Sequence, residues 1–338
     1  MRDHPHSHRT PSRALLGAAV IGLIVMSGCG GADEEPVTVG LITKQEDNPY
    51  WVTMRDVAQD TADDQGVTLL TATGQSDVDV ESQAVAIEDM VDQGADGILI
   101  APTDSTELVP AIEAARAAGV TVIALDTPVE PQSSVDAFYA TDNLRAGQLI
   151  GEYARAKAGE LGLAPKIAML DLAPGISSGE LRREGFLEGF GISSDDPQVV
   201  GSADTEGDQE LGKVAMEKLL GDAPDINVVY TVNEPAALGA LEALKDADVD
   251  LDGVVVVSVD GGCVAIKDAV RPGDIDATAQ QYPQNMARKG VSAIAEEVRG
   301  GPVPSGFLDT GVELVTGDPA PGVESKDVAF GVRNCWGG

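Results

Sequence analysis

Short aliphatic runs alternate along the chain with longer stretches in which apolar residues recur at helical spacing. In the first part of the chain, the runs that predict buried parallel strands are residues 37–43, 67–72, 97–101 and 120–126. The intervening stretches that predict amphipathic helices are residues 50–65, 80–93 and 106–118. Alternation of this kind is typical of a doubly wound α/β sheet, because each helix covers one face of the sheet between neighbouring strands.

The same alternation recurs beyond residue 141, which predicts a second α/β half. Its expected strands are residues 166–172, 197–203, 226–231, 254–260 and 274–280. Its expected helices are residues 178–190, 208–220, 234–246 and 283–298. The predicted fold class is therefore α/β, with two doubly wound parallel-sheet lobes. Ligands of such sheets bind at the carboxyl ends of the strands, so the residues that follow each strand are the candidates for a binding site.

The chain begins with the pattern of a secretory signal. Residues 14–26 form an uninterrupted apolar run that follows several arginines and ends at the sequence MSGC. The run is shorter than the roughly 20 apolar residues that span a membrane comfortably, which favours a cleaved signal peptide over residues 1–28 rather than an uncleaved anchor. The ending resembles a bacterial lipobox. This resemblance implies a lipid on Cys29, with residues 29–36 as a membrane-anchored tether outside the cytoplasm.

All three histidines, His4, His6 and His8, lie within this signal. The mature chain would lack the usual general base, so we expect neither a histidine-dependent hydrolase nor a histidine-ligated metal site. The segment GISSG (175–179) matches a nucleophile elbow, but its serine has no such base and we interpret the segment as a loop. The segment DVDLDG (248–253) begins like a calcium loop but lacks its final glutamate, and we interpret it as an acidic turn. We therefore expect no enzymatic activity, no cofactor and no metal.

The charge balance narrows the choice of partners. The chain carries 22 lysines and arginines against 56 aspartates and glutamates, a formal net charge of −34 at pH 7. Such a surface repels nucleic acid and anionic lipid headgroups, so a DNA-binding role is disfavoured. Hydrophobic residues make up 43% of the chain and aromatic residues only 4%, a composition suited to aliphatic cores of the α/β kind.

The segments that follow the predicted strands are polar or aromatic, and they carry a resemblance to a known family. They are DNPYW (47–51), PTDS (102–105), LDTP (125–128), LRREGF (181–186), NEPAALGAL (233–241), VDGG (259–262) and QQYP (280–283). Together with the terminal NCWG (334–337), they make the chain resemble the periplasmic sugar-binding proteins of ABC importers, in the ribose-type cluster and closest to its fructose-binding branch. The resemblance covers essentially the whole mature chain, and it implies the type I periplasmic-binding-protein fold.

The resemblance also implies which residues contact a sugar. Tyr50 and Trp51 would pack on the C–H faces of the sugar, while Asn48 and Asp126 would bind its hydroxyls. The other residues implied for the site are Lys44, Arg182, Asn233, Asp260 and Gln281, with Arg183 as the alternative to Arg182. Each has a structural alternative, because an asparagine can simply cap a helix and an aspartate can end a strand. Trp51 would report binding by its fluorescence, whereas Trp336 would respond little.

Two departures from the ribose receptors bear on the ligand. Thr127 and Ala101 stand where those receptors carry larger polar groups, which would leave room for the extra hydroxymethyl group of a ketohexose such as fructose. Ribose and mannose are the alternatives. The resemblance further implies a disulfide between Cys263 and Cys335, against the alternative of two free thiols.

The expected organisation is a monomer of two lobes joined by three crossovers near residues 141, 280 and 311. The N-terminal lobe would comprise residues 37–141 and 281–310, and the C-terminal lobe residues 142–280 and 311–338. A monosaccharide would bind between the lobes and stabilise a closed state that an ABC transporter permease recognises. The alternative function is a sensory one, in which the protein presents ribose or a furanose-like signal to a membrane sensor. A transcription regulator with this core would need a DNA-binding headpiece where this chain has a secretory signal.

Overall fold

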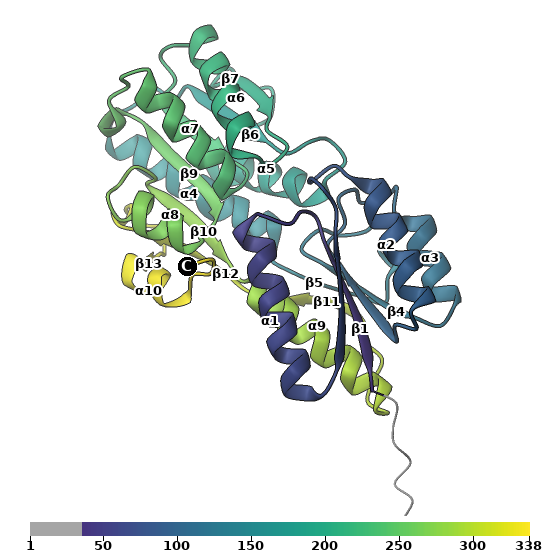
Figure 1. Cartoon of the computed structure of the whole chain (residues 1–338). Helices are drawn as coiled ribbons and strands as arrows, with labels where there is room; N and C mark the ends of the chain where they lie inside the picture. The colour runs from purple at the N-terminus through teal and green to yellow at the C-terminus, as the bar shows by residue number, and fades with distance from the viewer. Residues whose placement is uncertain (1–35) are drawn as a thin grey trace, which may run out of the picture. The chain divides into compact units, whose positions relative to one another are not determined.

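Two sheets with helices on both faces organise residues 36–338, the part of the chain that the computed structural model describes (Figure 1). The predicted signal peptide over residues 1–28, its histidines and Cys29 lie outside the described residues. Among residues 36–338, no helix is both long enough and apolar enough to cross a membrane.

The first sheet has six strands in the order β11-β5-β4-β3-β1-β2, and all neighbouring strands run parallel. Its strands are β1 (Thr38–Thr43), β2 (Thr68–Thr73), β3 (Gly97–Ile100), β4 (Thr121–Leu125), β5 (Ala137–Ala140) and β11 (Gly306–Asp309). Its helices are α1 (Pro49–Gln65), α2 (Val80–Asp92), α3 (Val109–Ala117) and α9 (Pro283–Val298). Helices α1 and α9 pack on one face of the sheet, and α2 and α3 pack on the other. We call this sheet with its helices the N-terminal lobe.

The second sheet has seven strands in the order β13-β12-β10-β9-β8-β6-β7. Its strands are β6 (Ile167–Asp171), β7 (Val199–Asp204), β8 (Val228–Thr231), β9 (Val255–Asp260), β10 (Ala277–Gln281), β12 (Val312–Thr316) and β13 (Lys326–Asp327). Its helices are α4 (Asn143–Glu160), α5 (Ser177–Phe190), α6 (Gln209–Asp222), α7 (Glu234–Asp246), α8 (Cys263–Ala265) and α10 (Val328–Asn334). Helices α4 and α5 cover one face, and α6, α7 and α10 cover the other. We call this the C-terminal lobe.

The prediction of two parallel α/β sheets is confirmed, with one antiparallel pair as the exception. Strand β12 runs antiparallel to β10. The chain reaches β12 directly from β11, which ends at the cleft edge of the N-terminal lobe. It therefore enters the second sheet at the edge where the parallel strands end, and it must run in the opposite direction to them.

Two elements between the predicted halves were not anticipated. Strand β5 has only four residues, which is too short for a clear pattern. Helix α4 has 18 residues, but it contains Gly147, Gly151 and Gly159, and glycine is a poor helix former. The helix forms nevertheless, because its apolar side packs on the second sheet and on α5.

Helices α4 and α5 approach each other backbone to backbone through two pairs of glycines. A side chain at Gly147 or Gly151 of α4 would overlap the carbonyl oxygen of Arg182 or Phe186 on α5. Gly185 and Gly189 of α5 face α4 in the same way, over the carbonyls of Leu144 and Gln148. The glycines are therefore required by the close approach of the two helices. This approach sets the position of α5, which carries Arg182 into the cleft described below.

We expect Gly151→Ala to lower the free energy of unfolding by about 1–3 kcal/mol, because the added methyl group forces the two helices apart. Gly159→Ala on the same helix is the matched control, since nothing lies within 4 Å of its added methyl group. That change should raise stability by roughly 0.5–1 kcal/mol through helix propensity alone. Urea unfolding monitored by circular dichroism measures both. Equal effects of the two substitutions would contradict the role given to the helix contact.

The chain passes between the two sheets three times. It does so between β5 and α4, between β10 and α9, and between β11 and β12. A disulfide joins Cys263, just after β9, to Cys335 at the end of α10, which is the pair that the family resemblance implied. With a sequence separation of 72 residues, it contributes roughly 4 kcal/mol in the chain-entropy picture.

Candidate ligand-binding site

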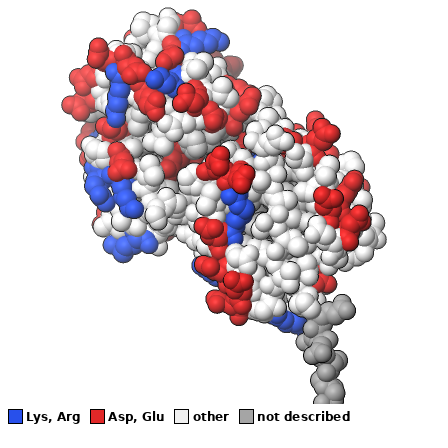
Figure 2. Space-filling model, viewed as in Figure 1, with Lys and Arg blue, Asp and Glu red and all other residues white. Residues whose placement is uncertain are grey.

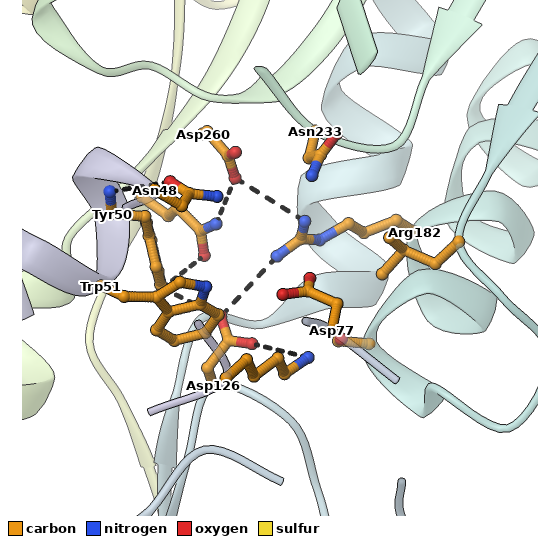
Figure 3. A pocket seen from close by; sticks show the side chains of 12 residues that line it. Asn48, Tyr50, Trp51, Asp77, Asp126, Arg182, Asn233 and Asp260 are labelled. Atoms are coloured by element: carbon orange, nitrogen blue, oxygen red, sulfur yellow. Dashed lines mark hydrogen bonds and ion pairs between the residues drawn. The ribbon is translucent and has the colours of Figure 1, made fainter. Parts of the chain in front are cut away.

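A cleft lies where the carboxyl ends of the strands of the two lobes meet (Figure 3). The N-terminal lobe lines it with Lys44, Asn48, Tyr50, Trp51, Asp77 and Asp126. The C-terminal lobe lines it with Leu172, Ser178, Arg182, Asn233, Asp260 and Gln281. The fold thus brings all nine residues proposed from the sequence into one cleft, and it adds Asp77, Leu172 and Ser178.

The aromatic wall of the cleft is the first turn of α1. Asn48 caps this helix by accepting a hydrogen bond from the Tyr50 backbone N–H (2.9 Å), and a proline follows it at the first helical position. The rings of Tyr50 and Trp51 meet edge to face with centroids 4.7 Å apart. Within residues 36–338, the buried Trp51 Nε1–H makes no well-formed hydrogen bond, and the Asp77 carboxyl is the acceptor it faces. It is a donor available to a ligand, since an unsatisfied buried donor is costly.

Asp126 and Asp260 end strands β4 and β9 and hold equivalent places in the two lobes. Both have a positive φ, 63° at Asp126 and 111° at Asp260, which is uncommon for residues other than glycine. Backbone strain of this kind concentrates at functional sites. Asp126 Oδ1 accepts the Tyr50 hydroxyl (2.9 Å), while Asp260 Oδ1 accepts the Gln281 amide (2.5 Å).

Arg182 connects the two aspartates across the cleft. Its guanidinium lies 3.9 Å from Asp126 Oδ1 and 3.7 Å from Asp260 Oδ1 (Figure 3). It is held from behind, because its Nε donates to Asn143 Oδ1 (2.8 Å) and one terminal nitrogen donates to the Val232 carbonyl (3.0 Å). Arg183 points elsewhere and pairs with Asp171. Of the two arginines considered from the sequence, Arg182 is the one at the cleft.

Acidic side chains outnumber basic ones in the chain, and two of the basic ones are buried in the cleft. Figure 2 shows acidic side chains spread over both lobes on one face, with fewer basic ones among them. Lys44 and Arg182 are buried in the cleft, with 1% and 3% of their surfaces exposed. They face three buried carboxylates, those of Asp77, Asp126 and Asp260. Burial raises the pKa of Asp77, and it raises that of Asp260 to about 6. The cleft therefore offers more charged acceptors than charged donors.

Asp77 was not proposed from the sequence, although it follows a predicted strand as the proposed site residues do. It lies in the loop after β2, at the same edge of the sheet as the other strand-end residues. Its side chain is buried, and Oδ1 accepts a hydrogen bond from Gln45 Nε2 (2.8 Å). The loop sequence QSDVD (75–79) follows a predicted strand, so inspection of this strand end would have included it.

Asn233 is in the cleft but has a structural task as well. Its Oδ1 caps α7 by accepting the Ala236 N–H (3.1 Å), and its Nδ2 donates to the Gly207 carbonyl (3.0 Å). Asn233 therefore caps α7, which was the structural alternative considered for it from the sequence. One amide hydrogen remains for a ligand.

The loop GISSG contributes to the cleft by contact rather than by catalysis. The Ser178 hydroxyl shares a hydrogen bond with the Thr127 hydroxyl of the other lobe (2.9 Å). Ser177 is bonded in the same way to Ser105 (2.6 Å). Within residues 36–338, no group of three or more acidic, cysteine or histidine side chains is placed to hold a metal ion, and the segment 248–253 is a capped turn.

These contacts nearly close the cleft. The space between its side chains is about 30 Å³, against the roughly 300–1,000 Å³ of typical small-molecule sites. A molecule of sugar size could therefore enter this cleft only if the lobes separated. The three chain connections between the lobes are where such a hinge motion can occur.

The space expected from Thr127 and Ala101 is not found. The Thr127 hydroxyl is engaged by Lys44 (3.0 Å), Asp126 (3.0 Å) and Ser178, and Ala101 is not part of the cleft lining. Trp336, which we expect to respond little to binding, does not line the cleft but packs behind its aromatic wall. Its ring centroid is 5.1 Å from that of Tyr50, because the C-terminal segment folds back onto α1.

Two α/β lobes around a polar cleft with a hinge define a solute-binding protein, and comparisons with known proteins agree. The periplasmic binding protein domain matches residues 39–302, and the chain belongs to this family. The family consists of binding proteins rather than enzymes. The ribose import binding protein RbsB of Bacillus subtilis is 31% identical over 268 residues, which cover 79% of this chain and 84% of that protein.

Two further relatives extend the comparison. A D-ribose/D-allose-binding protein of Pseudomonas aeruginosa is 28% identical over 323 residues, covering 91% of this chain and 99% of that protein. A solved periplasmic solute-binding protein of Actinobacillus succinogenes, with bound D-allose, superimposes with a TM-score of 0.73 at 25% identity, covering 83% of this chain and 97% of that one.

A buried carboxyl behind Asp260 makes stability depend on pH. Burial, together with the nearby Asp260 carboxylate, raises the pKa of Glu234 from 4.5 to about 7. The folded state therefore binds more protons than the unfolded state between these values, so this group's contribution to stability falls as the pH rises from about 4.5 to about 7. Relative to Glu234→Gln, the parent should lose unfolding free energy between pH 5 and pH 8.

Chemical unfolding at several pH values measures this difference. Glu242→Gln on the exposed side of the same helix is the control for removal of a glutamate charge. Parallel stability profiles for the parent and Glu234→Gln would contradict the assignment.

Proposed function

We propose that this protein is the extracytoplasmic binding component of an ABC importer and that its ligand is a monosaccharide. The observation that supports this most directly is the composition of the cleft. Two aromatic rings stand beside buried charged and amide side chains from both lobes, and this combination suits a small molecule with apolar faces and many hydroxyls.

The mechanism follows from the division of these side chains between the lobes. Asp126, Tyr50 and Trp51 belong to one lobe, and Arg182 and Asp260 belong to the other. A ligand that bonds both sets at once lowers the free energy of the closed state relative to the open one. The permease then selects the closed form, and no covalent step is needed.

The relatives guide the choice of sugar. Their names point to D-ribose and D-allose, whereas the motif resemblance pointed to fructose. The case for fructose relied on extra space beside Thr127 and Ala101, and the cleft does not support it. We therefore place D-ribose and D-allose first, followed by D-fructose and D-mannose. The three carboxylates favour a ligand that donates several hydrogen bonds, which a neutral polyhydroxy compound does.

Calorimetric titration of residues 30–338 with these four sugars tests the proposal. We expect at least one to bind with micromolar or tighter affinity. Asp126→Asn should weaken that binding by about 2 kcal/mol, or roughly thirty-fold in Kd, because it removes a buried charged acceptor. Asp77→Asn should act in the same direction.

Asp92→Asn, on the exposed surface of α2, is the control for loss of a carboxylate. It should bind like the parent. Heats at the level of dilution for all four sugars, or equal affinities for Asp126→Asn and the parent, would overturn the assignment of ligand or cleft.

We further propose that Cys29 carries the lipid anchor expected from the sequence. The mature protein should then fractionate with membranes, and Cys29→Ala should release it. Mass spectrometry of the mature N-terminus decides the matter, since an unmodified terminus at another residue is incompatible with the anchor.

A further inference from the structure

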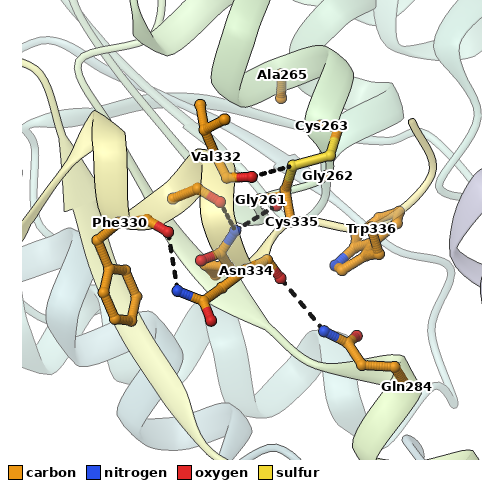
Figure 4. The surroundings of a disulfide bond; sticks show 12 residues. Gly261, Gly262, Cys263, Ala265, Gln284, Phe330, Val332, Asn334, Cys335 and Trp336 are labelled. Atoms are coloured by element: carbon orange, nitrogen blue, oxygen red, sulfur yellow. Dashed lines mark hydrogen bonds between the residues drawn. A yellow bond between two sulfur atoms is a disulfide. The ribbon is translucent and has the colours of Figure 1, made fainter.

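The last residues of the chain leave the C-terminal lobe and return to the wall of the cleft. Helix α10 packs in the C-terminal lobe, and Cys335 at its end is bonded to Cys263 after β9 (Figure 4). Beyond this bond, Trp336 is 5% exposed and packs in the core of the N-terminal lobe. A side chain at Gly337 would come within 2.8 Å of Pro49, the first residue of α1.

Trp336 contacts the two cleft residues Tyr50 and Gln281 from behind. Its ring meets the Tyr50 ring edge to face, with centroids 5.1 Å apart and an interplanar angle of 83°. Its Nε1–H donates to the backbone carbonyl of Gln281 (3.0 Å), at the connection between β10 and α9. Its own carbonyl accepts the Cys263 N–H (2.7 Å). One residue thus joins the disulfide loop, through its backbone, to a connection between the lobes and the aromatic wall, through its side chain.

The two residues that Trp336 supports make the polar contacts of the cleft. The Tyr50 hydroxyl donates to Asp126 and also lies 3.3 Å from Gln281 Oε1. Gln281 Nε2 donates to Asp260. A shift of the Tyr50 ring or of the Gln281 backbone would therefore disturb the hydrogen bonds to Asp126 in one lobe and to Asp260 in the other. Small displacements of binding groups lower affinity.

We propose that Trp336 is a positioning residue for the cleft, and that the Cys263–Cys335 disulfide is what keeps it in place. The segment 335–338, which we call the C-terminal clasp, sets the orientation of Tyr50 and Gln281 without lining the cleft itself. The disulfide is the covalent link between the clasp and the loop after β9, and the Cys263 N–H adds a hydrogen bond to the Trp336 carbonyl there. Because the clasp is only four residues long and follows a short helix, we expect this hydrogen bond to weaken once the disulfide is removed. The consequence for affinity rests on the proposed function; the consequence for the order of α1 does not.

The first test needs no ligand. Amide hydrogen exchange in residues 48–56 should be several-fold faster in Trp336→Ala and in the double variant Cys263→Ser/Cys335→Ser than in the parent. Exchange in α3 should be unchanged, because that helix packs on the face of the first sheet opposite to α1 and Trp336. Trp336→Phe keeps an aromatic edge against Tyr50 and should restore most of the protection.

The matched control is Phe330→Ala. Phe330 is an aromatic residue of the same tail, but it packs in the C-terminal lobe and lies beside Lys326 rather than Tyr50. It should lower overall stability without changing exchange in residues 48–56. If Phe330→Ala and Trp336→Ala have the same effect there, the tail is a general stabilising element and the proposal is wrong.

A fluorescence experiment examines the disulfide separately. In Trp51→Phe, Trp336 is the only tryptophan. Its emission should be blue-shifted in the oxidised protein and should move to longer wavelength when Cys263→Ser/Cys335→Ser is added, because the ring leaves the core. Identical spectra would show that the disulfide does not hold the clasp.

The affinity test uses D-ribose, D-allose and D-fructose. For whichever sugar binds the parent, Kd should rise about tenfold in Trp336→Ala, less in Trp336→Phe, and not in Phe330→Ala. Unchanged affinity in Trp336→Ala would overturn the positioning role. If the parent binds none of the sugars, the proposed ligand class fails, while the exchange and fluorescence results still decide whether the clasp exists.

Discussion

The cleft depends on one buried guanidinium that lies between carboxylates of different lobes. Arg182 comes from the C-terminal lobe and faces Asp260 of its own lobe and Asp126 of the other. Carboxylates buried without a counter-charge are strongly unfavourable. Removing this cation would leave Asp260 without its ion pair, and it would leave Asp126 with Lys44 alone, 3.9 Å away. Since the ion-pair distances exceed hydrogen-bond length, the charges still have capacity for a ligand between them.

The surroundings of Arg182 explain why the rest of the fold is built as it is. Helices α4 and α5 meet through glycines, which brings Asn143 of α4 within hydrogen-bond distance of the Arg182 side chain. On the opposite wall, the first turn of α1 places Tyr50 and Trp51, and the C-terminal clasp packs behind Tyr50. Each wall is therefore supported by a tightly packed element outside the cleft. Rigid walls that move as bodies suit a protein whose ligand must enter between them.

Charge is distributed in a way that separates solubility from recognition. The surface is strongly acidic, whereas the cleft holds buried Lys44 and Arg182 against the buried carboxylates of Asp77, Asp126 and Asp260. Burial raises the pKa values of Asp260 and Glu234. Asp260 lies at the end of β9 and Glu234 at the start of α7, next to Asn233, which caps that helix. The acidic residues of this edge thus serve structure and recognition together.

Periodicity and strand-end chemistry in the sequence determined most of this picture. The family resemblance, rather than the pattern, implied the nine cleft residues. Periodicity predicted most of the parallel strands, the helices that follow them and the class of fold, and strand-end chemistry marked the residues after each strand as candidates for a site. They did not predict α4, whose glycines lower local helix propensity and make sense only against α5. Nor did they place Trp336 beside Tyr50, since residues 286 positions apart become neighbours only when the folded chain returns its C-terminal segment to α1. The local pattern thus predicted most elements and where they end. The close approach of distant backbones is encoded in no single segment, and only the tertiary structure determines it.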